Sequence, residues 1–310
     1  MASWGLSATI KAPLAEIEAF AAHHLELGAH RLYLYLDDPD PDTQAALKAH
    51  PKIRVTACDA THWAKLTGKR PAKHQVRQTA NATHAYGRRA EVDWLIHMDV
   101  DEFLWPEAPL PDLLGALPDA ALCARVRPIE ALAGGGTLFK GFIPNGPARE
   151  AIVDRLYPTY GRYLKGGFLS HVAGKLFLRT GLGALTVKIH NVFRGEEMNP
   201  GEVELHGVDL CHCHAQSWEE WIAAFRYRHE KGSYRAELGP SRPRARGGVT
   251  LHELFAEILA QEGEAGLRAF HEETCADTPR LRAALEAEGL LRVRDLDLEA
   301  KRRTHFPQSG

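Results

Sequence analysis

The stretch Trp94-Leu-Ile-His-Met-Asp99-Val-Asp101-Glu102-Phe103 decides the fold that we expect for this chain. Residues 94–98 form a short, mostly apolar run with large side chains, which predicts a buried strand. Asp99 and Asp101 follow at its end, and a charge buried alone there would be costly. A divalent cation suits two such carboxylates, because hard cations prefer oxygen ligands and can bridge to phosphate oxygens.

The spacing of these two carboxylates is not specific by itself. Asp-x-Asp also occurs at Asp38/Asp40, Asp40/Asp42 and Asp295/Asp297. The prolines of residues 37–42 favour a solvated turn, and that segment lacks the Gly and the distal Glu of an EF-hand loop. The third triplet alternates with leucine, as a surface segment does. A metal site at Asp99 and Asp101 therefore needs support from the rest of the chain.

Composition narrows the classes of function. With 310 residues, 45% hydrophobic and 25% charged, the chain has room for one large globular domain, with or without an appendage. A net charge of −2 gives no electrostatic case for binding nucleic acid. No apolar run approaches the roughly 20 residues of a membrane-spanning helix. The first residues do not resemble a signal peptide, and the five scattered cysteines predict no disulfide framework. We expect a cytoplasmic protein, and peripheral membrane association stays open.

The first hundred residues alternate between two periodicities. Strands are predicted at residues 5–10, 31–36, 53–57 and 94–98, and helices at 13–27 and 72–88. Such alternation predicts a parallel, doubly wound sheet with right-handed crossovers. Ligands of these sheets bind beyond the carboxyl ends of the strands, which here carry Lys11, Asp37 and the Asp99/Asp101 pair.

The remaining chain has a different pattern. Strands at 122–126, 175–179 and 185–190 are expected to add antiparallel members to the sheet, joined by loops rich in Gly and Pro. A proline- and arginine-rich stretch, Pro240–Arg246, reads as a solvated linker. Beyond residue 248 the apolar residues follow one helical face. We therefore predict a catalytic domain over 1–240 and a helical extension over 241–310.

Several of these segments, taken in order, resemble glycosyltransferase family 2, in its bacterial branch with a DxDEF motif. The resemblance covers roughly the first 235 residues. It rests on His24-Leu-Glu-Leu-Gly28, the tyrosine-rich strand before Asp37, the block Trp94–Phe103, Lys175-Leu-Phe-Leu-Arg179 with His190, and Leu210-Cys-His212-Cys-His214-Ala-Gln-Ser217. One departure is Lys11-Ala12-Pro13, where relatives usually have Lys-Asn-Glu, and it bears on the donor contacts near Lys11.

The resemblance implies a GT-A fold, which is a Rossmann-like, mostly parallel sheet flanked by helices, here with a C-terminal helical extension. It implies inverting transfer of a sugar from a nucleotide-sugar donor, most simply a UDP-sugar, to a hydroxyl of a glycan or another acceptor. Asp99, Asp101 and His212 would hold Mn²⁺ or Mg²⁺ against the diphosphate, and Lys11, Asp37, Gln78, Asp99 and Lys175 would contact the donor. Inversion requires a general base; Glu150, Asp154 and His171 are candidates, and we favour Asp154.

Other interpretations of the same residues stay open. Glu102 and Phe103 are expected to pin the loop, Glu102 by bonding backbone amides and Phe103 by entering the core. Cys211-His-Cys-His214 could be a structural zinc cluster, but no second pair follows at finger-like spacing. A metal-dependent hydrolase or nucleotidyltransferase could use the same carboxylates. A non-catalytic scaffold with a GT-A fold is the third reading.

Overall fold

The computed structural model describes residues 1–88 and 91–307, and the chain forms two compact units. The first unit comprises Met1–Arg127, Ala173–Leu210 and Leu296–Gly310, and the second comprises Pro128–Val172 and Cys211–Asp295. The units are therefore interleaved along the sequence, whereas the predicted domains meet once, at residue 240. That domain boundary stays a prediction.

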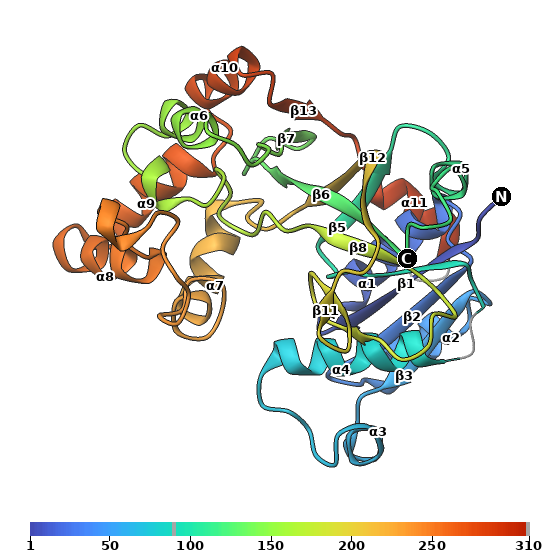
Figure 1. Cartoon of the computed structure of the whole chain (residues 1–310). Coiled ribbons are helices and arrows are strands. Elements are labelled where there is room, and N and C mark those ends of the chain that lie inside the picture. The colour runs from blue at the N-terminus through green and yellow to red at the C-terminus, as the bar shows by residue number, and fades with distance from the viewer. Residues whose placement is uncertain (89–90, 308–310) are drawn as a thin grey trace. The chain divides into compact units, whose positions relative to one another are not determined.

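The first unit begins with alternating strands and helices (Figure 1). In order, its elements up to residue 127 are β1 (Trp4–Ile10), α1 (Leu14–Glu26), β2 (Arg31–Leu36), α2 (Pro41–Lys48), β3 (Ile53–Ala57), α3 (Ala60–Leu66), α4 (His74–Gly87), β4 (Trp94–His97), β5 (Glu102–Pro106), α5 (Leu110–Gly115) and the first part of β6 (Cys123–Ala131). Later segments add β8 (Lys175–Arg179), β9 (Thr186–Val187), β10 (Val192–Arg194), β11 (Glu197–Met198), most of β12 (Glu202–His212) and α11 (Leu298–His305).

The sheet of the first unit has the strand order β6-β8-β4-β1-β2-β3. β1 pairs in parallel with both β2 and β4, and β2 pairs in parallel with β3. β8 joins β4 and β6 by antiparallel ladders. All seven residues of β1 are buried, as expected for a central strand covered on both faces. The predicted α/β class, with a Rossmann-like sheet flanked by helices, is confirmed.

Packing on the sheet and on other helices holds the helices of the first unit in place. α4 packs on β1, and α11 packs on α1, so the last described helix returns to the beginning of the chain. One apolar cluster combines Tyr35, Trp63, Tyr86 and Leu178 from strands and helices far apart in sequence. The short antiparallel sheet β11-β10-β9 lies outside the main sheet. Residues 185–190 were predicted as one strand of the main sheet, and this was wrong, because only Thr186–Val187 is extended and it pairs with β10.

The second unit is built around helices. Its elements are the end of β6, β7 (Leu138–Lys140), α6 (Arg149–Leu156), the 3-10 turn η1 (Gly161–Tyr163), the end of β12, α7 (Trp218–Glu230), the 3-10 turn η2 (Arg244–Arg246), α8 (Leu251–Gln261), α9 (Gly263–Thr274), α10 (Pro279–Ala287) and β13 (Leu291–Val293). β7 pairs with both β6 and β13 in antiparallel fashion. Trp221, Phe255 and Phe270, each with no exposed surface, form the centre of its core.

The helix α2 was not predicted from the sequence. Residues 37–42 were expected to form a solvated turn, but Pro41 is the first residue of α2 and Asp40 is its N-cap. The Asp40 carboxylate accepts a hydrogen bond of 2.8 Å from the Thr43 amide. Proline suits the first turn because it lacks the N–H that would have no partner there. Asp40 therefore has a structural role as a cap.

Among the helices that the structure describes, none has both the length and the apolar character that a bilayer crossing requires.

A substitution at Gly5 tests how closely β1 packs against β2. A Cβ at this position would lie 2.6 Å from the Arg31 carbonyl oxygen, so a side chain here forces the strands apart. We expect Gly5→Ala to lower the free energy of unfolding by about 1–3 kcal/mol, as overpacking does. Urea unfolding followed by circular dichroism measures the change. Gly87→Ala is the matched control, because its Cβ would meet no atom within 4 Å. Equal stability of the two variants would contradict this account of the strand pairing.

Candidate functional site

The carboxyl ends of β1, β2 and β4 carry the residues that the sequence singled out. β1 lies between the other two strands, and the backbone joins their ends directly. The Asp37 amide donates to the Ile10 carbonyl at 2.8 Å, and the Met98 amide donates to the Ser7 carbonyl at 3.0 Å. Asp37 and Asp99 therefore follow strands on either side of β1. This edge of the sheet is the usual ligand position in α/β folds.

Asp99 is held by donors from two different elements. Lys175, the first residue of β8, places its Nζ 2.6 Å from Asp99 Oδ2 and 3.2 Å from Glu102 Oε2. Gln78 of α4 donates a hydrogen bond from its amide to Asp99 Oδ1. Asp99 retains 28% of its side-chain exposure, whereas the Lys175 and Glu102 side chains have none. Asp99 is thus the solvent-facing member of a buried charge cluster.

The electrostatics of this cluster favour the charged forms. Burial would raise the pKa of Asp99, but the positive charge of Lys175 outweighs burial and holds the pKa well below its usual range. Burial would lower the pKa of Lys175, but Asp99 and Glu102 outweigh it, and the pKa is raised. His97 lies behind them, and burial, with a further contribution from Lys175, lowers the pKa of His97 to about 4. His97 is neutral at pH 7 in consequence.

The loop between β4 and β5 is pinned as the sequence predicted. The Asp99 amide donates a 2.8 Å hydrogen bond to Glu102 Oε2. Phe103 is 5% exposed, and its ring lies 6.2 Å from the Phe20 ring of α1. Glu102 therefore fixes the backbone at Asp99 while it also neutralises Lys175. The prediction that Glu102 and Phe103 hold the loop is confirmed.

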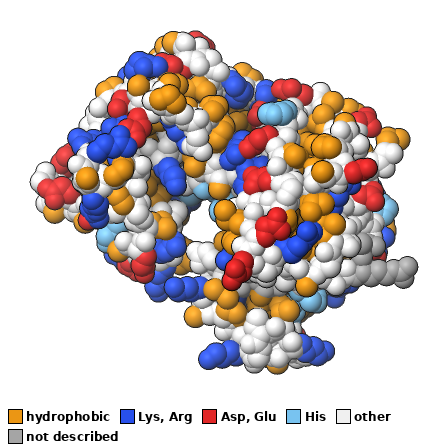
Figure 2. Space-filling view, viewed as in Figure 1, with side chains coloured by type: hydrophobic (Ala, Val, Ile, Leu, Met, Phe, Trp, Pro, Cys, Tyr) orange, Lys and Arg blue, Asp and Glu red, His pale blue; other side chains and the backbone are white. Residues whose placement is uncertain are grey.

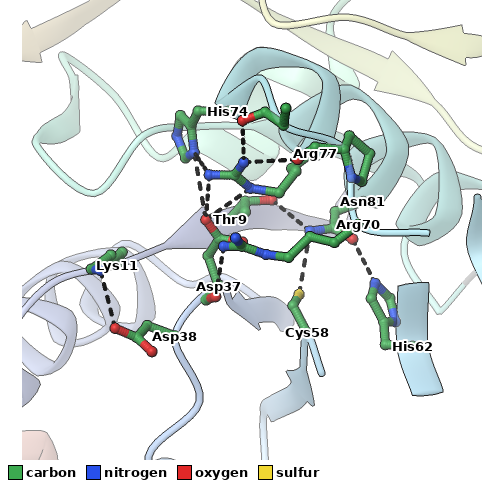
Figure 3. Close-up of polar contacts among 12 residues, drawn as sticks. Thr9, Lys11, Asp37, Asp38, Cys58, His62, Arg70, His74, Arg77 and Asn81 are labelled. Carbon is green, nitrogen blue, oxygen red and sulfur yellow. Dashed lines mark hydrogen bonds and ion pairs between the residues drawn. The ribbon is translucent and has the colours of Figure 1, made fainter. Parts of the chain in front are cut away.

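Asp37 forms a second cluster, drawn in Figure 3. Arg70 and Arg77 place guanidinium nitrogens 3.0 and 2.8 Å from its two oxygens, and His74 Nδ1 lies 3.8 Å away. Burial would raise the pKa of Asp37, but the nearby His74 and the hydrogen bonds from Arg77 and Arg70 outweigh it and lower the pKa. Its side chain is only 2% exposed. Asp37 thus orients two arginines and a histidine at the end of β2.

The helix α4 links the two clusters. Arg77 binds Asp37 through its guanidinium, and the next residue, Gln78, binds Asp99 through its amide. Asn81, one turn later, donates to Thr9 of β1 at 3.1 Å. Three side chains on a single helix therefore fix the ends of β1, β2 and β4 relative to one another. We regard this as the main geometric feature of the site.

A basic segment leads into this helix. Residues 60–77 contain Lys65, Lys69, Arg70, Lys73 and Arg77 and no acidic residue. The three lysines are exposed. Figure 2 shows Lys and Arg side chains at the lowest part of the view, which is formed by α3. Such a segment beside the strand ends attracts anions.

A cavity of about 300 Å³ opens at the ends of β1 and β2. Its walls include Ile10, Lys11, Pro13, Leu36 and Asp38. Lys11 forms an ion pair of 3.1 Å with Asp38, and both side chains are about two-thirds exposed. A pair this exposed is weak and can be exchanged for a ligand group. The volume lies at the lower end of the range for small-molecule sites.

The donor set at Asp99 constrains any metal that binds there. Both carboxylate oxygens already accept hydrogen bonds, one of them from an ammonium group. A divalent ion on Asp99 would have to use the remaining lone pairs and lie beside the charge of Lys175. The residues therefore fit a metal at Asp99 poorly while Lys175 stays in place. Asp101 would then be the main ligand for the predicted metal ion on this loop.

The third predicted metal ligand, His212, belongs to the second unit. Within that unit its ring centroid lies 5.1 Å from that of His171 and 5.3 Å from that of His214. Three imidazoles are thus gathered at the end of β12, and imidazole is a better ligand for zinc than for Mn²⁺, which prefers oxygen ligands. His214 also contacts the Tyr234 hydroxyl at 3.3 Å. The joint metal site of Asp99, Asp101 and His212 stays a prediction.

Asp154, the predicted general base, lies on α6 in the second unit. Arg242 donates to its Oδ1 at 2.6 Å, and Arg246 donates to the neighbouring Glu150 at 3.0 Å. The segment Pro240–Arg246 is therefore tied to α6 and is not the freely solvated linker that we expected. Asp154 keeps 49% of its side-chain exposure. Its role as a base stays a prediction.

The sequence analysis identified the lysine at Asp99 as a site residue, but it did not identify the two arginines at Asp37. Lys175 was predicted as a donor contact, which stays a prediction, and the structure shows that it forms an ion pair with Asp99. Arg70 and Arg77 were not predicted. The absence of acidic residues between 60 and 77 was the available signal, since an unbalanced basic run beside a strand end predicts an anionic partner.

No protein-family model matches the chain, and no curated protein matches it. Remote likenesses exist among solved structures. A mycobacterial protein is 13% identical, covers 77% of this chain and 78% of its own, and has a TM-score of 0.36. HddC from Yersinia pseudotuberculosis is 9% identical, with 58% and 75% covered and a TM-score of 0.29.

A third structure is the glycosyltransferase GlyE of Streptococcus pneumoniae. It is 17% identical, covers 41% of this chain and 30% of its own, and has a TM-score of 0.27. These weak structural neighbours thus include a glycosyltransferase. Likenesses at this level define neither family nor activity, so the functional argument has to rest on the residues of the chain itself.

Removal of the Lys175 charge tests the Asp99 cluster. Lys175→Met leaves two buried carboxylates without their cation, and we expect it to cost about 3–5 kcal/mol of stability at pH 7. The lowered pKa of Asp99 contributes stability above the ordinary aspartate pKa of about 3.9, and this contribution is lost as the pH falls toward the lowered pKa. The difference between wild type and variant is therefore largest near neutral pH and narrows below about pH 4.

Urea unfolding at pH 7, 4 and 3 measures this difference. Lys48→Met, on the exposed side of α2, is the control and is expected to stay within about 0.5 kcal/mol of wild type. A difference that stays constant from pH 7 to pH 3 would show that the Lys175 charge does not stabilise the carboxylates.

Proposed function

We propose that the first unit binds a nucleotide-sugar donor at the carboxyl ends of β1, β2 and β4, and that the protein is a glycosyltransferase. The observation that carries the proposal is the convergence of Asp37 and Asp99 on consecutive residues of α4. This arrangement places two carboxylates with different partners at the carboxyl ends of the two strands that flank β1. The first is bound by arginines, and the second is bound by an ammonium group and an amide. The order of motifs that resembles glycosyltransferase family 2 supports the same conclusion.

The nucleoside is assigned to the cavity lined by Lys11 and Asp38. The apolar wall of Ile10, Pro13 and Leu36 offers a surface for a base, and Asp38 and Asp40 offer acceptors for ribose hydroxyls. The resemblance to glycosyltransferase family 2 makes UDP the first nucleotide to test. Lys11-Ala12-Pro13 replaces the Lys-Asn-Glu of relatives, so the acidic donor contact must come from Asp37, Asp38 or Asp40.

The diphosphate is assigned to the region between the two clusters. The exposed Lys65, Lys69 and Lys73 of the basic segment would supply the positive charge that attracts it. Mn²⁺ or Mg²⁺ would be held mainly by Asp101 and the predicted ligand His212, because Lys175 occupies Asp99, and it would supply positive charge to the departing nucleoside diphosphate. Gln78 and Lys175 would keep Asp99 in one orientation during this step, so that it does not have to reorganise. The acceptor hydroxyl would lose its proton to Asp154, the favoured base.

Donor binding is tested with UDP-, GDP-, CMP- and dTDP-sugars in a thermal-shift panel with and without Mn²⁺. A ligand that binds only the native state adds about 2.7 kcal/mol at about 100 times its dissociation constant, which such a panel resolves. We expect Asp37→Asn and Asp99→Asn to weaken nucleotide binding at least tenfold, and Asp101→Asn to remove its dependence on Mn²⁺. Asp119→Asn, an exposed carboxylate of the same unit, is the control. Undiminished binding in Asp37→Asn and Asp99→Asn would refute the placement of the donor.

The reaction is tested by identifying products. Sugar transfer leaves a free nucleoside diphosphate and a glycosylated acceptor, which chromatography and mass spectrometry detect together. A nucleoside monophosphate or free pyrophosphate would instead favour the hydrolase or nucleotidyltransferase reading of the same carboxylates. Failure of every nucleotide to bind with any metal would favour the non-catalytic scaffold. Asp154→Asn is expected to lower kcat at least a hundredfold with little change in donor binding, as loss of a general base does.

A further inference from the structure

The second unit contains a cavity of its own. Its volume is about 310 Å³, and three segments line it, namely residues 163–170 after η1, 233–241 after α7, and 250–252 at the start of α8. Figure 1 labels α7, which ends just before the second of these segments, and α8, whose start forms the third. The volume is that of a site for a small organic molecule.

The wall at Phe168–Ser170 is fixed from behind by a buried ion pair. The Glu130 carboxylate accepts hydrogen bonds from the Leu169 amide at 3.2 Å and from the Ser170 amide at 2.8 Å. Lys140 Nζ lies 2.6 Å from Glu130 and also donates to the Thr274 carbonyl at 2.9 Å. Because Glu130 and Lys140 are 2% and 1% exposed, their geometry is held by the surrounding core. This wall is therefore preorganised.

The opposite wall is fixed by aromatic residues. Tyr234 is 1% exposed, and its hydroxyl accepts a hydrogen bond of 3.1 Å from Trp221 Nε1. At the start of α8, Thr250 and Glu253 form a capping box that fixes the third segment. A cavity whose walls are held in this way keeps its shape without a ligand. That property lowers the entropic cost of binding.

The charges that face the cavity are all of one sign. Lys165 and Arg235 line it, and none of its lining residues is an aspartate or a glutamate. The Lys165 ammonium forms no ion pair with any residue in 1–88 or 91–307. Arg235 uses one nitrogen on the Gly232 carbonyl and approaches the exposed Glu237 only to 3.6 Å. Most of the five N–H donors of Arg235 are thus available to a ligand.

The polar and aromatic lining adds a second requirement. Ser233 lines the cavity, and its Oγ is shielded from water without a hydrogen-bond partner in the described part of the chain. Such an atom is costly, and rotation of this hydroxyl toward a ligand would break no existing bond. Tyr163 and Phe168 contribute ring surface beside it. A ligand with hydroxyls, an apolar face and an anionic group satisfies all of these features.

We infer that this pocket is a binding site for an anionic, hydroxylated molecule of monosaccharide size, such as a phosphorylated or carboxylated sugar. Lys165 and Arg235 bind the anionic group, and Ser233 with the two aromatic rings contacts the body of the ligand. The inference does not depend on the donor site proposed for the first unit. It adds a second small-molecule site to the protein.

The test measures binding of three probes to the full chain by isothermal titration calorimetry at pH 7. Glucose 6-phosphate and glucuronate separate the phosphate and carboxylate sources of the anion, and glucose lacks both. We expect at least one anionic probe to bind ten times more tightly than glucose. Lys165→Gln and Arg235→Gln should each weaken that binding at least tenfold, and Ser233→Ala by a smaller factor. Lys231→Gln, an exposed cation outside the pocket, should leave it unchanged.

Two results would overturn the inference. One is binding of glucose as tight as that of both anions, and the other is no binding of either anion by a folded protein. Asp99→Asn serves as the control for the first unit, since it is expected to weaken nucleotide binding at least tenfold without changing the affinity for the anionic sugar. Failure of the wild-type chain to bind any nucleotide, with binding of the anionic sugar intact, would contradict the proposed function and leave the pocket supported.

Discussion

The ammonium group of Lys175 is the interaction on which the first unit depends. A lysine with no exposed surface must have anionic partners, because desolvation of a lone charge would cost several kcal/mol. Lys175 finds them in Asp99 and Glu102, which lie at the junction of β4 and β5. Since Lys175 begins β8, the ion pairs fix the antiparallel strand β8 to the end of the parallel strand β4. The loop that carries Asp101 is built on this junction.

The two carboxylate clusters by themselves have too little net positive charge to attract an anionic donor. Asp37, Asp99 and Glu102 are matched in number by Arg70, Arg77 and Lys175, and each carboxylate is in contact with a cation. Mutual neutralisation leaves little net positive charge for a diphosphate. Attraction must then come from the exposed lysines of residues 65–73 or from a bound cation. What the buried clusters supply is position, since their atoms are already fixed before a ligand arrives.

The sequence could predict the features that depend on local patterns. β2, β3 and β8 agree residue for residue with the predicted strands, because runs of alternating or continuous apolar residues encode burial directly. The role of Glu102 could also be predicted from the sequence, because Glu102 contacts a residue only three positions away. Contacts between residues far apart in the sequence could not be predicted in this way. The Lys175–Asp99 contact and the arginines at Asp37 are examples. The α2 helix was missed because Asp-Pro-Asp was read as a turn, although Asp before Pro is also a helix start.

The second unit also contains a buried ion pair, and its hydrogen bonds show what such pairs contribute. Glu130 and Lys140 are about as deeply buried as Lys175 and Glu102. Desolvation offsets most of the attraction in such pairs, so that an apolar pair of similar volume is often equally stable. Their contribution is therefore directional. Glu130 orients two backbone amides and a hydroxyl at a cavity wall, and Glu102 orients the amide of Asp99. In each unit a buried glutamate positions the backbone next to a proposed ligand site.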